Sequence, residues 1–571
     1  MVEATADEAE AERGYDVEEI RRRRRGGRPP MGAAAAPGSI HTPMRLTHLS
    51  IRNFRGIASL SLTLGGESLL LVGANGAGKS AVLTAAAKAL GVDRGMSVED
   101  FVDPSQPVEI TATLSELGSL VGDFNAQAAF GPGGPTVTLG VHASVDGPEV
   151  EVVHGFPSAT WSRASRAQLR ALPVLSLSAA RDHARLLRLT GSTSLMAKLI
   201  AELDLSAPLD TAGRAVAQAA ADLVQAQPLQ DLLASGSAEL TKVLADAGSS
   251  AFALGSGPPL EMLRELQLTL GYGGRRAAIG QQPSGLAHLA VFAIALVAMQ
   301  RQPGSVVLVD EPELSLHPHA QRALIGRLRG SDAQLLIATH SAHALARLDL
   351  RQTVRLQSGP AGTTAHKASH VSDVEERRLA RYATADLTEA FFASTAVLVE
   401  GVSDRLALRI AAETLGVDLD SRGVSIVELN GAGLFATMLE LLGMSGLGIR
   451  VIGLCDADHE QQWAGAVLGP GVYNGDRSVL ARHEVYVLDP DIEGALVDAL
   501  GEQRVEAVIA ADGEAQGLAA FRQQPSQQQY SPREQLVRFV KKGKARWPPM
   551  LMGDTADTEV PNVIRDLINS V

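Results

Sequence analysis

The sequence has little of several things, and each shortage narrows the kinds of protein it can encode. It has a single cysteine, Cys455, so the chain cannot form an internal disulfide. No signal-peptide pattern stands at the N-terminus, and with the cysteine count this predicts a cytoplasmic protein. The most apolar stretch, Leu286 to Met299, contains His288 and is shorter than the roughly 20 residues that cross a bilayer. We therefore expect a buried core helix there and no membrane association.

Positive charge is also scarce: 51 Lys and Arg stand against 64 Asp and Glu, a formal net charge of −13. This balance argues against a protein that coats nucleic acid by bulk electrostatic attraction. It leaves room for a local basic groove, because carboxylates gathered around a metal lower the total charge without describing the surface that meets a substrate. At 571 residues and 45% hydrophobic content, the chain has room for about three or four domains.

The most informative segment that is present is GANGAGKS, Gly73 to Ser80, which fits the pattern GxxxxGK[ST]. An apolar run of strand length ends at Val72, and a helical pattern extends to Leu90. In such a strand, loop and helix, glycines bend the backbone so that its N–H groups converge on phosphates. We expect Lys79 to reach the β- and γ-phosphates of ATP and the Ser80 hydroxyl to hold Mg²⁺. The expected nucleotide-binding residues of this loop are Asn75, Gly76, Gly78, Lys79 and Ser80.

Two later apolar strands carry polar residues at their carboxyl ends. One, Ser305 to Val309, ends in Asp310 and Glu311, and the next along the chain ends in His340. Buried strands of this kind are typical of a parallel α/β sheet with a nucleotide site. Asp310 is placed to complete the Mg²⁺ shell begun by Ser80. Glu311 can polarise the attacking water, and His340 can sense the γ-phosphate.

Changes of composition predict five segments. Residues 1–43 carry an acidic run and then Arg21 to Arg25, which indicates a disordered tail rather than a nucleic-acid-binding arm. Residues 44–164 and 256–385 form the two parts of an ATPase, the first with strand-like runs at 45–51, 59–64, 108–114 and 136–141. Residues 165–255 read as a helical insertion or dimerisation region, although ordinary helices of one ATPase domain fit the same pattern. Residues 386–571 form a second α/β domain.

This second domain carries its own set of carboxylates. A strand from Val397 ends in Glu400, and an amphipathic helix carrying Asp404 follows it. After a further strand and helix, another strand ends in Asp456 and Asp458, which we expect to project to one side of an extended backbone. Carboxylates at the ends of neighbouring parallel strands can converge on Mg²⁺ or Mn²⁺. Two such ions can stabilise both the attacking and the leaving oxygen of a phosphodiester.

Several motifs together resemble the ABC-type ATPases of DNA metabolism, a group that includes RecF, SMC and the OLD (overcoming lysogenization defect) proteins. They are MRLTHLSIRNFRGI, GANGAGKS, QPSGLAHL, VLVDEPELSLHP and IATHS. The resemblance implies that Ser284 and Gly285 form the signature motif, which completes the nucleotide site of a partner protomer. It therefore implies a dimer. The signature departs from the usual LSGGQ-like string of that family.

The ordered set EGxxD and then DxD resembles the Toprim domain of topoisomerases, primases and OLD nucleases. This implies metal binding by Glu400, Asp404, Asp456 and Asp458. Glu493 matches the later acidic position of OLD-type Toprim domains, with Asp491 as its rival. The basic cluster Lys541 to Arg546 resembles the stretch that supplies a transition-state-stabilising lysine. Lys544 is favoured over Lys542, and a solvated helix end is the plain alternative.

An ABC-type ATPase followed by a Toprim domain is the layout of OLD-family ATP-dependent endonucleases. The resemblance implies an ATP-hydrolysing, metal-dependent DNA endonuclease, a dimer or larger assembly, that serves phage defence or DNA repair beside a helicase or another protein. ATP and Mg²⁺ are its implied cofactors, with Mn²⁺ or a second divalent ion at the Toprim site. The implied catalytic residues are Glu311, Glu400, Asp404, Asp456, Asp458 and Lys544. The implied metal ligands are Ser80, Asp310, Glu400, Asp404, Asp456, Asp458 and Glu493.

Two other functions stay open at this point. A RecF- or SMC-like protein would use ATP to gate DNA binding, and its Toprim domain would hold nucleic acid without cutting it. The ATPase subunit of a membrane transporter would explain the P-loop alone. It would leave the acidic set of the second domain unexplained, and it would need a transmembrane partner.

Overall fold

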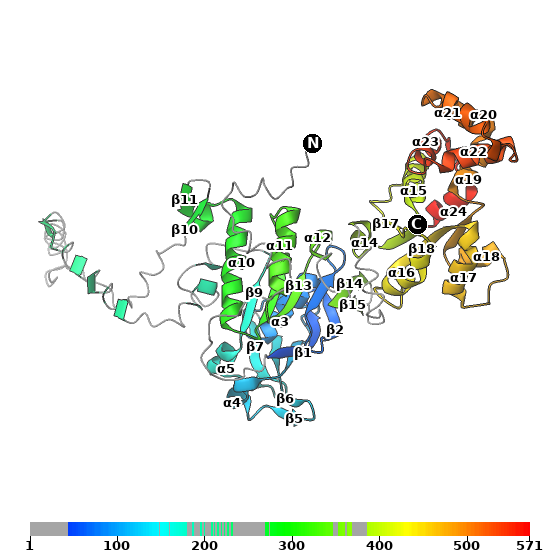
Figure 1. The fold of residues 1–571 in the computed structure, drawn as a ribbon. Helices are drawn as coiled ribbons and strands as arrows, with labels where there is room; N and C mark the ends of the chain where they lie inside the picture. The colour runs from blue at the N-terminus through cyan, green and yellow to red at the C-terminus, as the bar shows by residue number, and fades with distance from the viewer. Residues whose placement is uncertain are drawn as a thin grey trace, which may run out of the picture. The chain divides into compact units, whose positions relative to one another are not determined.

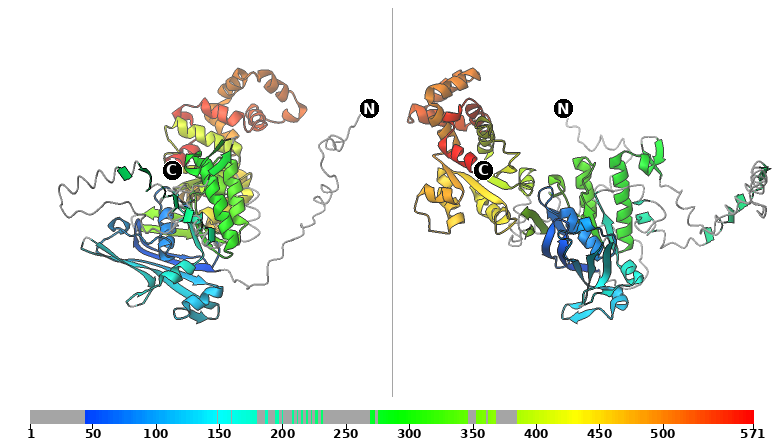
Figure 2. Two further views of the ribbon diagram at one scale, coloured as in Figure 1. Left: turned by 90° about the vertical axis from the view of Figure 1, so that its left-hand side faces the viewer. Right: turned by 180° about the vertical axis from the view of Figure 1, so that it is seen from behind.

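The computed structural model describes residues 44–179 except 148 and 159, 269–345 except 273 and 274, 352–359, 362–367 and 385–571, with isolated residues between 186 and 231. The predicted tail, 1–43, lies outside the described residues, and so does most of the predicted helical insertion, 165–255. The chain divides into two units, 1–41 and 42–571, and the description that follows concerns the second (Figures 1 and 2).

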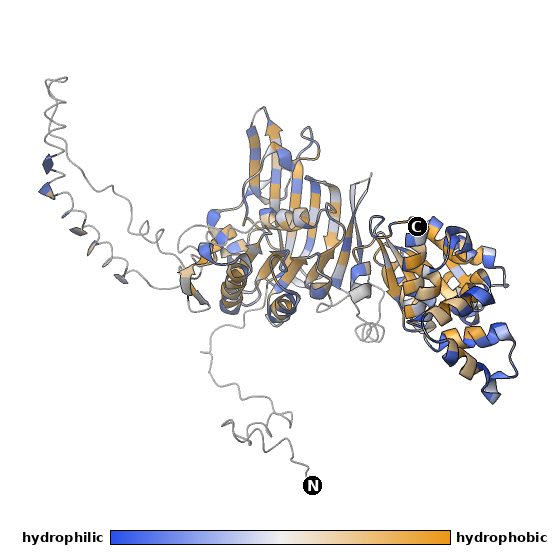
Figure 3. Ribbon diagram, turned by 90° about the horizontal axis from the view of Figure 1, so that it is seen from above, coloured by the Kyte–Doolittle hydropathy of each residue, from blue (hydrophilic) through white to orange (hydrophobic). Residues whose placement is uncertain are grey.

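The N-terminal part of the second unit contains an antiparallel sheet in the order β2-β1-β4-β6-β7-β8, with β5 paired to β6. Its strands are β1 (Arg45–Phe54), β2 (Ile57–Thr63), β4 (Val108–Ser115), β5 (Ala129–Gly131), β6 (Gly134–Asp146), β7 (Glu149–Phe156) and β8 (Ser162–Arg163). Buried and half-buried residues alternate along β4, and Figure 3 shows strands of this sheet banded in orange and blue. This period of two is that of a sheet with one covered face, and all four predicted strand runs lie in it.

A second, mainly parallel sheet has the order β15-β14-β3-β13-β12-β9, and only the edge hairpin β14–β15 is antiparallel. The strands are β3 (Leu69–Val72), β9 (Val174–Leu177), β12 (Val306–Asp310), β13 (Gln334–Ala338), β14 (Thr353–Gly359) and β15 (Gly362–Lys367). Strands β3, β12 and β13 are buried at every position, as continuous apolar runs predict. Their carboxyl ends share one edge, which gathers the residues that follow each strand.

Helices cover both faces of this parallel sheet. Helix α3 (Lys79–Ala89) shares a core with one face and with the antiparallel sheet. Helices α10 (Ser284–Arg301) and α11 (Pro318–Arg329) lie side by side on the other face (Figures 1 and 2). Shorter helices are α4 (Val121–Phe124), α5 (Arg166–Ala171) and α12 (Ala342–Leu345), and the hairpin β10 (Thr269–Tyr272) with β11 (Arg275–Ala278) precedes α10.

Helix α10 confirms the predicted apolar helix and corrects its length and burial. It has 18 residues, so among the described helices it is the one long and apolar enough, by length and composition, to cross a membrane. Val291 and Phe292 are fully buried, whereas Leu289 and Val297 are exposed. The expectation of a buried core helix therefore holds for one face of α10 only.

The C-terminal domain has a four-stranded, fully parallel sheet in the order β17-β16-β18-β19. Its strands are β16 (Thr395–Val399), β17 (Val424–Glu428), β18 (Arg450–Asp456) and β19 (Val485–Leu488). One face packs on α15 (Val402–Thr414), α19 (Ile492–Leu500), α22 (Pro532–Lys541), α23 (Trp547–Gly553) and α24 (Asn562–Ser570). The other face packs on α16 (Phe435–Leu442) and α17 (Glu460–Leu468). The remaining helices are α14 (Ala385–Ala390), α18 (Arg477–Arg482), α20 (Glu502–Ala511) and α21 (Ala515–Arg522).

Close packing against β18 explains a glycine in the middle of that strand. The rings of Phe435 and Trp463 stack with centroids 3.9 Å apart. A Cβ atom at Gly453 would lie 2.9 Å from both rings, closer than side chains tolerate. Gly453 therefore lets α16 and α17 approach the strand that ends in Asp456.

A buried arginine joins the ATPase sheet to the C-terminal domain. Arg355 lies in β14, in register with Val72 of β3, and is only 5% exposed. Its guanidinium donates to the carbonyl oxygens of Ala393 at 3.0 Å, Gly448 at 3.2 Å and Leu447 at 3.4 Å. These three residues precede β16 and β18. Strand β14, which lies beside the P-loop strand β3, is thus hydrogen-bonded to the segments just before β16 and β18, the strands that lead to Glu400 and Asp456.

Candidate ATP and metal sites

The P-loop connects β3 to α3, as the sequence predicts. Gly73 has φ 135° and approaches β14 so closely that a Cβ atom would lie 2.2 Å from the Leu356 carbonyl oxygen. Gly78 has φ 97° and stands just before α3. Side chains other than hydrogen would be strained at both positions, so the loop needs its glycines to keep this course.

The lysine and serine of the loop lie beside the expected metal-binding aspartate. Lys79 is buried, and its Nζ donates to the carbonyl oxygens of Gly73 at 2.8 Å and Ala74 at 2.9 Å. Burial lowers the pKa of Lys79 to about 8, although the negative charge of Asp310 opposes this. The Ser80 hydroxyl donates to Asp310 Oδ1 at 3.1 Å. Residues from β3, α3 and β12 therefore meet at one edge of the parallel sheet.

The acidic loop after β12 contacts the strand that carries His340. Glu311 has φ 48°, a left-handed backbone conformation that is uncommon outside glycine. Glu313, to which the motif alone assigned no role, accepts a hydrogen bond from the backbone N–H of His340 at 2.7 Å. Burial raises the pKa of Glu313, and burial with the nearby Lys79 charge lowers the pKa of His340. Glu313 thus holds the backbone of His340 close to Lys79 and Asp310.

The predicted signature stands at the start of α10. Ser284 is exposed, and Gly285 lies so close to the loop after β12 that a Cβ atom would sit 2.6 Å from the Ser315 carbonyl oxygen. His288, one turn further on, is buried and hydrogen-bonds through Nε2 to the Pro312 carbonyl at 2.9 Å. The described contacts therefore tie the signature to the acidic loop of its own chain.

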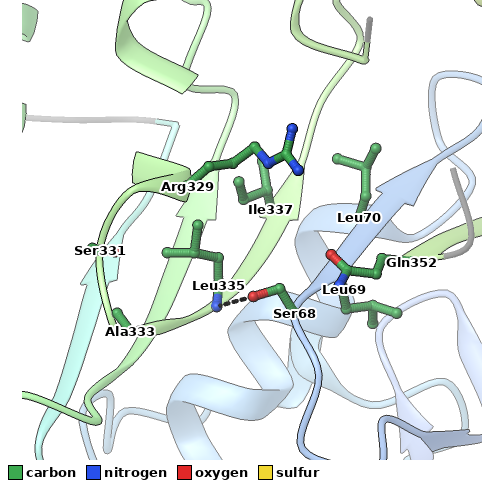
Figure 4. A pocket seen from close by; sticks show the side chains of 9 residues that line it. All are labelled: Ser68, Leu69, Leu70, Arg329, Ser331, Ala333, Leu335, Ile337 and Gln352. Carbon is green, nitrogen blue, oxygen red and sulfur yellow. Dashed lines mark hydrogen bonds between the residues drawn. The ribbon is translucent and has the colours of Figure 1, made fainter. Parts of the chain in front are cut away.

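Two cavities lie at different edges of the parallel sheet. One of about 260 Å³ lies beside the ATP-site residues and is lined by Thr84, Leu177 and Asp310 among others. The other, of about 210 Å³, lies where β3 and β13 begin, and Figure 4 shows Arg329 and Gln352 there. In it the Ser68 hydroxyl accepts from the Leu335 backbone N–H at 3.0 Å. Only the first cavity borders residues predicted to bind ATP or metal.

The C-terminal domain brings three of the predicted carboxylates together. Glu400 follows β16, and its Oε1 accepts a hydrogen bond from the backbone N–H of Asp456 at 2.9 Å. Asp404, in the first turn of α15, is buried and accepts from the Gly401 N–H at 3.0 Å. Asp456 is the last residue of β18. The three residues thus lie near the carboxyl ends of β16 and β18.

Burial suppresses the ionisation of Asp404 and Asp456, and the like charges around them add to the effect. Burial raises the pKa of Asp404 to about 7, with the charges of Glu493 and Glu400 adding to the effect. Burial raises the pKa of Asp456 to about 8, with Asp404 and Glu400 adding. Buried like charges favour the protonated form unless a cation compensates them. The site is therefore short of positive charge.

Asp458 corrects one structural expectation. The backbone after Asp456 is not extended, because residues Ala457–His459 form a 3₁₀ turn. The Asp458 side chain is 78% exposed, whereas Asp456 is half-buried. The two carboxylates therefore do not project together in an extended strand, and Asp458 stands at the rim of the site.

Both members of the later acidic pair are buried near the site, and their contacts differ. Glu493 is 2% exposed and accepts a hydrogen bond from the Ser403 hydroxyl at 3.3 Å. Burial, and then the charge of Asp491, raises the pKa of Glu493. Asp491 instead caps α19 through the Gly494 N–H at 2.8 Å and pairs with Lys541 at 2.5 Å.

The lysines of the basic cluster, Lys541 to Arg546, point to different parts of the domain. Lys542 turns away, with its Nζ 4.2 Å from the ring centroid of Phe521. The positive charge of Lys544 acts on Asp404 and Glu493, and its carbonyl accepts from the Ser403 hydroxyl at 3.0 Å. These positions favour Lys544 over Lys542. Lys541, through its pair with Asp491, is a second cation at the site.

The donor set suits a divalent cation. Its carboxylate oxygens are the hard ligands that Mg²⁺ and Mn²⁺ accept, and Asp456 Oδ1 is buried without a hydrogen-bond partner among the described residues. Among the residues that the structure describes, no three His, Cys, Asp or Glu side chains are already arranged to hold a metal ion. Binding an ion therefore requires side-chain rotation, for which the exposed Asp458 has room.

The fold and the residues at the carboxyl ends of the two parallel sheets define a class of protein. It is a P-loop ATPase joined in one chain to a parallel α/β domain whose strands end in carboxylates. Comparison with protein families confirms this pairing. The family described as "Overcoming lysogenization defect protein-like, TOPRIM domain" matches residues 391–458. The family described as "AAA domain, putative AbiEii toxin, Type IV TA system" matches residues 170–346. The C-terminal domain is thus an OLD-like Toprim domain, and the preceding part is an ATPase domain.

Known proteins agree with these matches. The OLD nuclease of Thermus scotoductus is 26% identical to this chain over 416 residues, which cover 68% of this chain and 77% of the relative. The predicted resemblance to the OLD family is therefore confirmed, and the ATPase and Toprim domains use nucleotide and divalent metal in general.

Three solved structures are similar to parts of this chain. The C-terminal region of the Burkholderia pseudomallei OLD protein is 23% identical and covers 31% of this chain and 96% of its own, with a TM-score of 0.26. The corresponding region from Xanthomonas campestris pv. campestris is 24% identical and covers 32% and 93%, with a TM-score of 0.27. A Pyrococcus furiosus Smc head domain is 13% identical and covers 59% and 99%, with a TM-score of 0.37.

Proposed function

We propose that this protein is an ATP-hydrolysing, divalent-metal-dependent DNA endonuclease that serves phage defence or DNA repair. One observation carries the proposal: Glu400, Asp404 and Asp456 meet at one edge of the Toprim sheet, in a chain whose P-loop lysine, serine and aspartate also meet. The relative named as a nuclease supports the same activity. The domain limits predicted above, with the Toprim part beginning near residue 386, belong to this proposal.

The Toprim residues would divide the work as follows. Divalent ions bound there would supply an activated water and stabilise the oxygens of the scissile phosphodiester. Glu400, Asp404, Asp456, Asp458 and Glu493 would hold the ions, and Ser403 would orient Glu493 through their hydrogen bond. The ammonium group of Lys544 stabilises the negative charge that develops on the phosphate. Asp404 and Asp456 release protons when they bind a cation, because their pKa values are raised without one.

The ATPase residues would bind and hydrolyse ATP. Asn75, Gly76 and Gly78 shape the loop around the phosphates, and Lys79 exchanges the carbonyls of Gly73 and Ala74 for phosphate oxygens. Ser80 and Asp310 hold Mg²⁺, Glu311 polarises the attacking water and His340 senses the γ-phosphate. Ser284 and Gly285 complete the nucleotide site of a second copy, so the working form is a dimer or larger assembly.

The test is cleavage of supercoiled and linear plasmid by the purified full chain with Mg²⁺ or Mn²⁺, with and without ATP. We expect metal-dependent cutting that Glu400→Gln abolishes. Glu413→Gln, an exposed change on α15, serves as the matched control and should cut normally. If no condition gives cutting that depends on Glu400, the endonuclease proposal is wrong. The alternative of an ATP-gated protein that binds DNA without cleaving it would then be favoured.

A further inference from the structure

A histidine stands between two of the Toprim carboxylates and has no role in the function proposed above. His459 closes the 3₁₀ turn that follows β18, directly after Asp458. Its Nδ1 lies 2.9 Å from Glu400 Oε2 and 3.2 Å from Asp458 Oδ1. Glu400 belongs to β16 and Asp458 to the turn after β18, so His459 contacts the acids of both strands.

The separations of His459 Nδ1 from the two carboxylates are hydrogen-bonding distances, and they also allow the three groups to become neighbouring ligands of one ion after a small side-chain rotation. Two donors that sit side by side on a six-coordinate cation, each at about 2.1 Å, are about 3 Å apart. The separations from His459 Nδ1 to the two carboxylates match this value. Glu400 is held in place because its other oxygen accepts from the Asp456 N–H at 2.9 Å. Its side chain is 11% exposed, while that of Asp458 is 78% exposed and has room to turn inward.

The chemistry of imidazole predicts which ions such a site would prefer. A neutral histidine carries a lone pair on one ring nitrogen and a proton on the other. Nitrogen donors suit transition-metal ions, whereas Mg²⁺ selects oxygen ligands and keeps several waters. A site with one nitrogen and several carboxylate oxygens therefore discriminates between divalent ions that a purely carboxylate site treats more alike.

We propose that His459 is a nitrogen ligand of the divalent ion held by Glu400 and Asp458, and that it makes this site bind Mn²⁺ in preference to Mg²⁺. The inference rests on the proposed function, since it takes these carboxylates to bind a divalent ion. It adds a ligand that neither the acidic motif nor the family match assigns.

The experiment measures metal binding on the full chain without nucleotide, so that it does not depend on DNA cleavage. Pulsed electron paramagnetic resonance of bound Mn²⁺ detects a directly coordinated imidazole by its nitrogen modulation. Mn²⁺ affinity is measured by titration and Mg²⁺ affinity by competition. His459→Asn keeps a hydrogen-bonding group near the position of Nδ1 but removes the imidazole. His483→Asn, an exposed histidine of the same domain, is the matched control.

We expect nitrogen modulation in the wild type and in His483→Asn, and its loss in His459→Asn. Mn²⁺ affinity should fall about tenfold or more in His459→Asn, with Mg²⁺ affinity falling less than about threefold. Bound Mn²⁺ without nitrogen modulation, or modulation that persists in His459→Asn, would overturn the inference.

Glu400→Gln separates this inference from the function on which it rests. If Glu400→Gln weakens Mn²⁺ binding while His459→Asn changes neither modulation nor affinity, the carboxylate site stands and the histidine ligand is excluded. If Glu400→Gln binds Mn²⁺ like the wild type, the proposed metal site itself is wrong. Equal thermal unfolding midpoints of the variants establish that each folds.

Discussion

The ATP edge and the Toprim edge share one architecture, and burial shifts the pKa of a lysine at the first and of two aspartates at the second. In both, parallel strands end together and an adjoining helix begins there, which is where open α/β sheets place their ligands. At the ATP edge, Lys79 lies among Asp310 and Glu311, and burial lowers its pKa to about 8. At the Toprim edge, buried carboxylates outnumber the lysines, and the pKa values of Asp404 and Asp456 rise instead.

This difference indicates what each edge receives. A buried ammonium group beside backbone N–H groups is suited to a polyanion such as a triphosphate. Buried carboxylates with raised pKa values are suited to cations that replace their protons. In the proposed function, one edge would bind phosphate through its own positive charge and the other would reach phosphate through metal. If the two edges are separate catalytic sites, changes at one should leave the chemistry of the other intact.

The largest expected effect comes from Asp456→Asn. The change keeps the shape of the side chain and removes a charge that contacts the proposed metal. DNA cleavage should fall by about 10²- to 10³-fold or more, while ATP hydrolysis stays within about twofold. Plasmid cleavage and phosphate release are measured on the same preparation, with exposed Asp420→Asn as the control. Unchanged cleavage would remove Asp456 from the site.

The reciprocal change is Lys79→Met at the ATP edge. ATP hydrolysis should fall by about 10²-fold or more, because the charge that meets the phosphates is lost. Mn²⁺ binding at the Toprim edge should keep its wild-type affinity. Phosphate release and Mn²⁺ titration without nucleotide measure the two effects, and Lys367→Met at the end of β15 is the control. A loss of Mn²⁺ binding in Lys79→Met would contradict the separation of the two edges.

A smaller effect is expected from Ser403→Ala. The hydroxyl has one proton to donate and lies within hydrogen-bonding distance of two acceptors, the Lys544 carbonyl at 3.0 Å and Glu493 at 3.3 Å, so it ties the basic loop to α19. We expect cleavage to fall about tenfold and the free energy of unfolding to fall by about 1 kcal/mol. Denaturant unfolding and cleavage are compared with exposed Ser421→Ala. Wild-type cleavage in a correctly folded Ser403→Ala would exclude a positioning role.

The last prediction concerns stability alone and is a pH dependence that belongs to the Toprim edge. The pKa of Asp456 is raised from 3.8 to about 8 in the folded protein, so the folded state holds a proton that the unfolded state has lost between these values. The associated stability is complete below about pH 4 and is lost as pH rises toward 8, by up to about 1.4 kcal/mol per pH unit. In a metal chelator, the thermal midpoint should therefore drop more steeply between pH 5.5 and 8.5 in the wild type than in Asp456→Asn. Parallel curves for the two proteins would show that Asp456 does not hold this proton.

Much of both edges could be predicted because their residues lie in short, ordered motifs. The P-loop is contiguous, and Asp310, Glu400 and Asp456 each follow a continuous apolar strand, so strand polarity alone places them at a carboxyl end. The position of Asp458 could not be predicted this way, because a 3₁₀ turn replaces the expected extended backbone immediately after the strand. Side chains two residues apart lie on the same side only in an extended strand, so this rule does not apply after the strand has ended.

Residues that act from other segments were missed for a different reason. Ser403 and Lys541 reach the acidic edge through partners about 90 and 50 residues away along the chain, and no local pattern marks such contacts. Arg355 looks like an ordinary strand residue until its three carbonyl partners are seen. His459 adjoins the DxD motif, so its chemistry alone could have raised the question of a nitrogen ligand.

The sequence by itself determined that one strand would lead into a glycine-rich loop and that others would end in carboxylates, because glycine spacing and strand-terminal carboxylates are local properties of the chain. The tertiary structure decided that Lys542 lies over the Phe521 ring, that Glu493 meets the Ser403 hydroxyl while Asp491 pairs with Lys541, and that Arg355 hydrogen-bonds to residues just before β16 and β18. Those outcomes depend on packing between helices and strands far apart in sequence. Burial and the approach of like charges, which raise the pKa values of Asp404 and Asp456, arise only when that packing is complete.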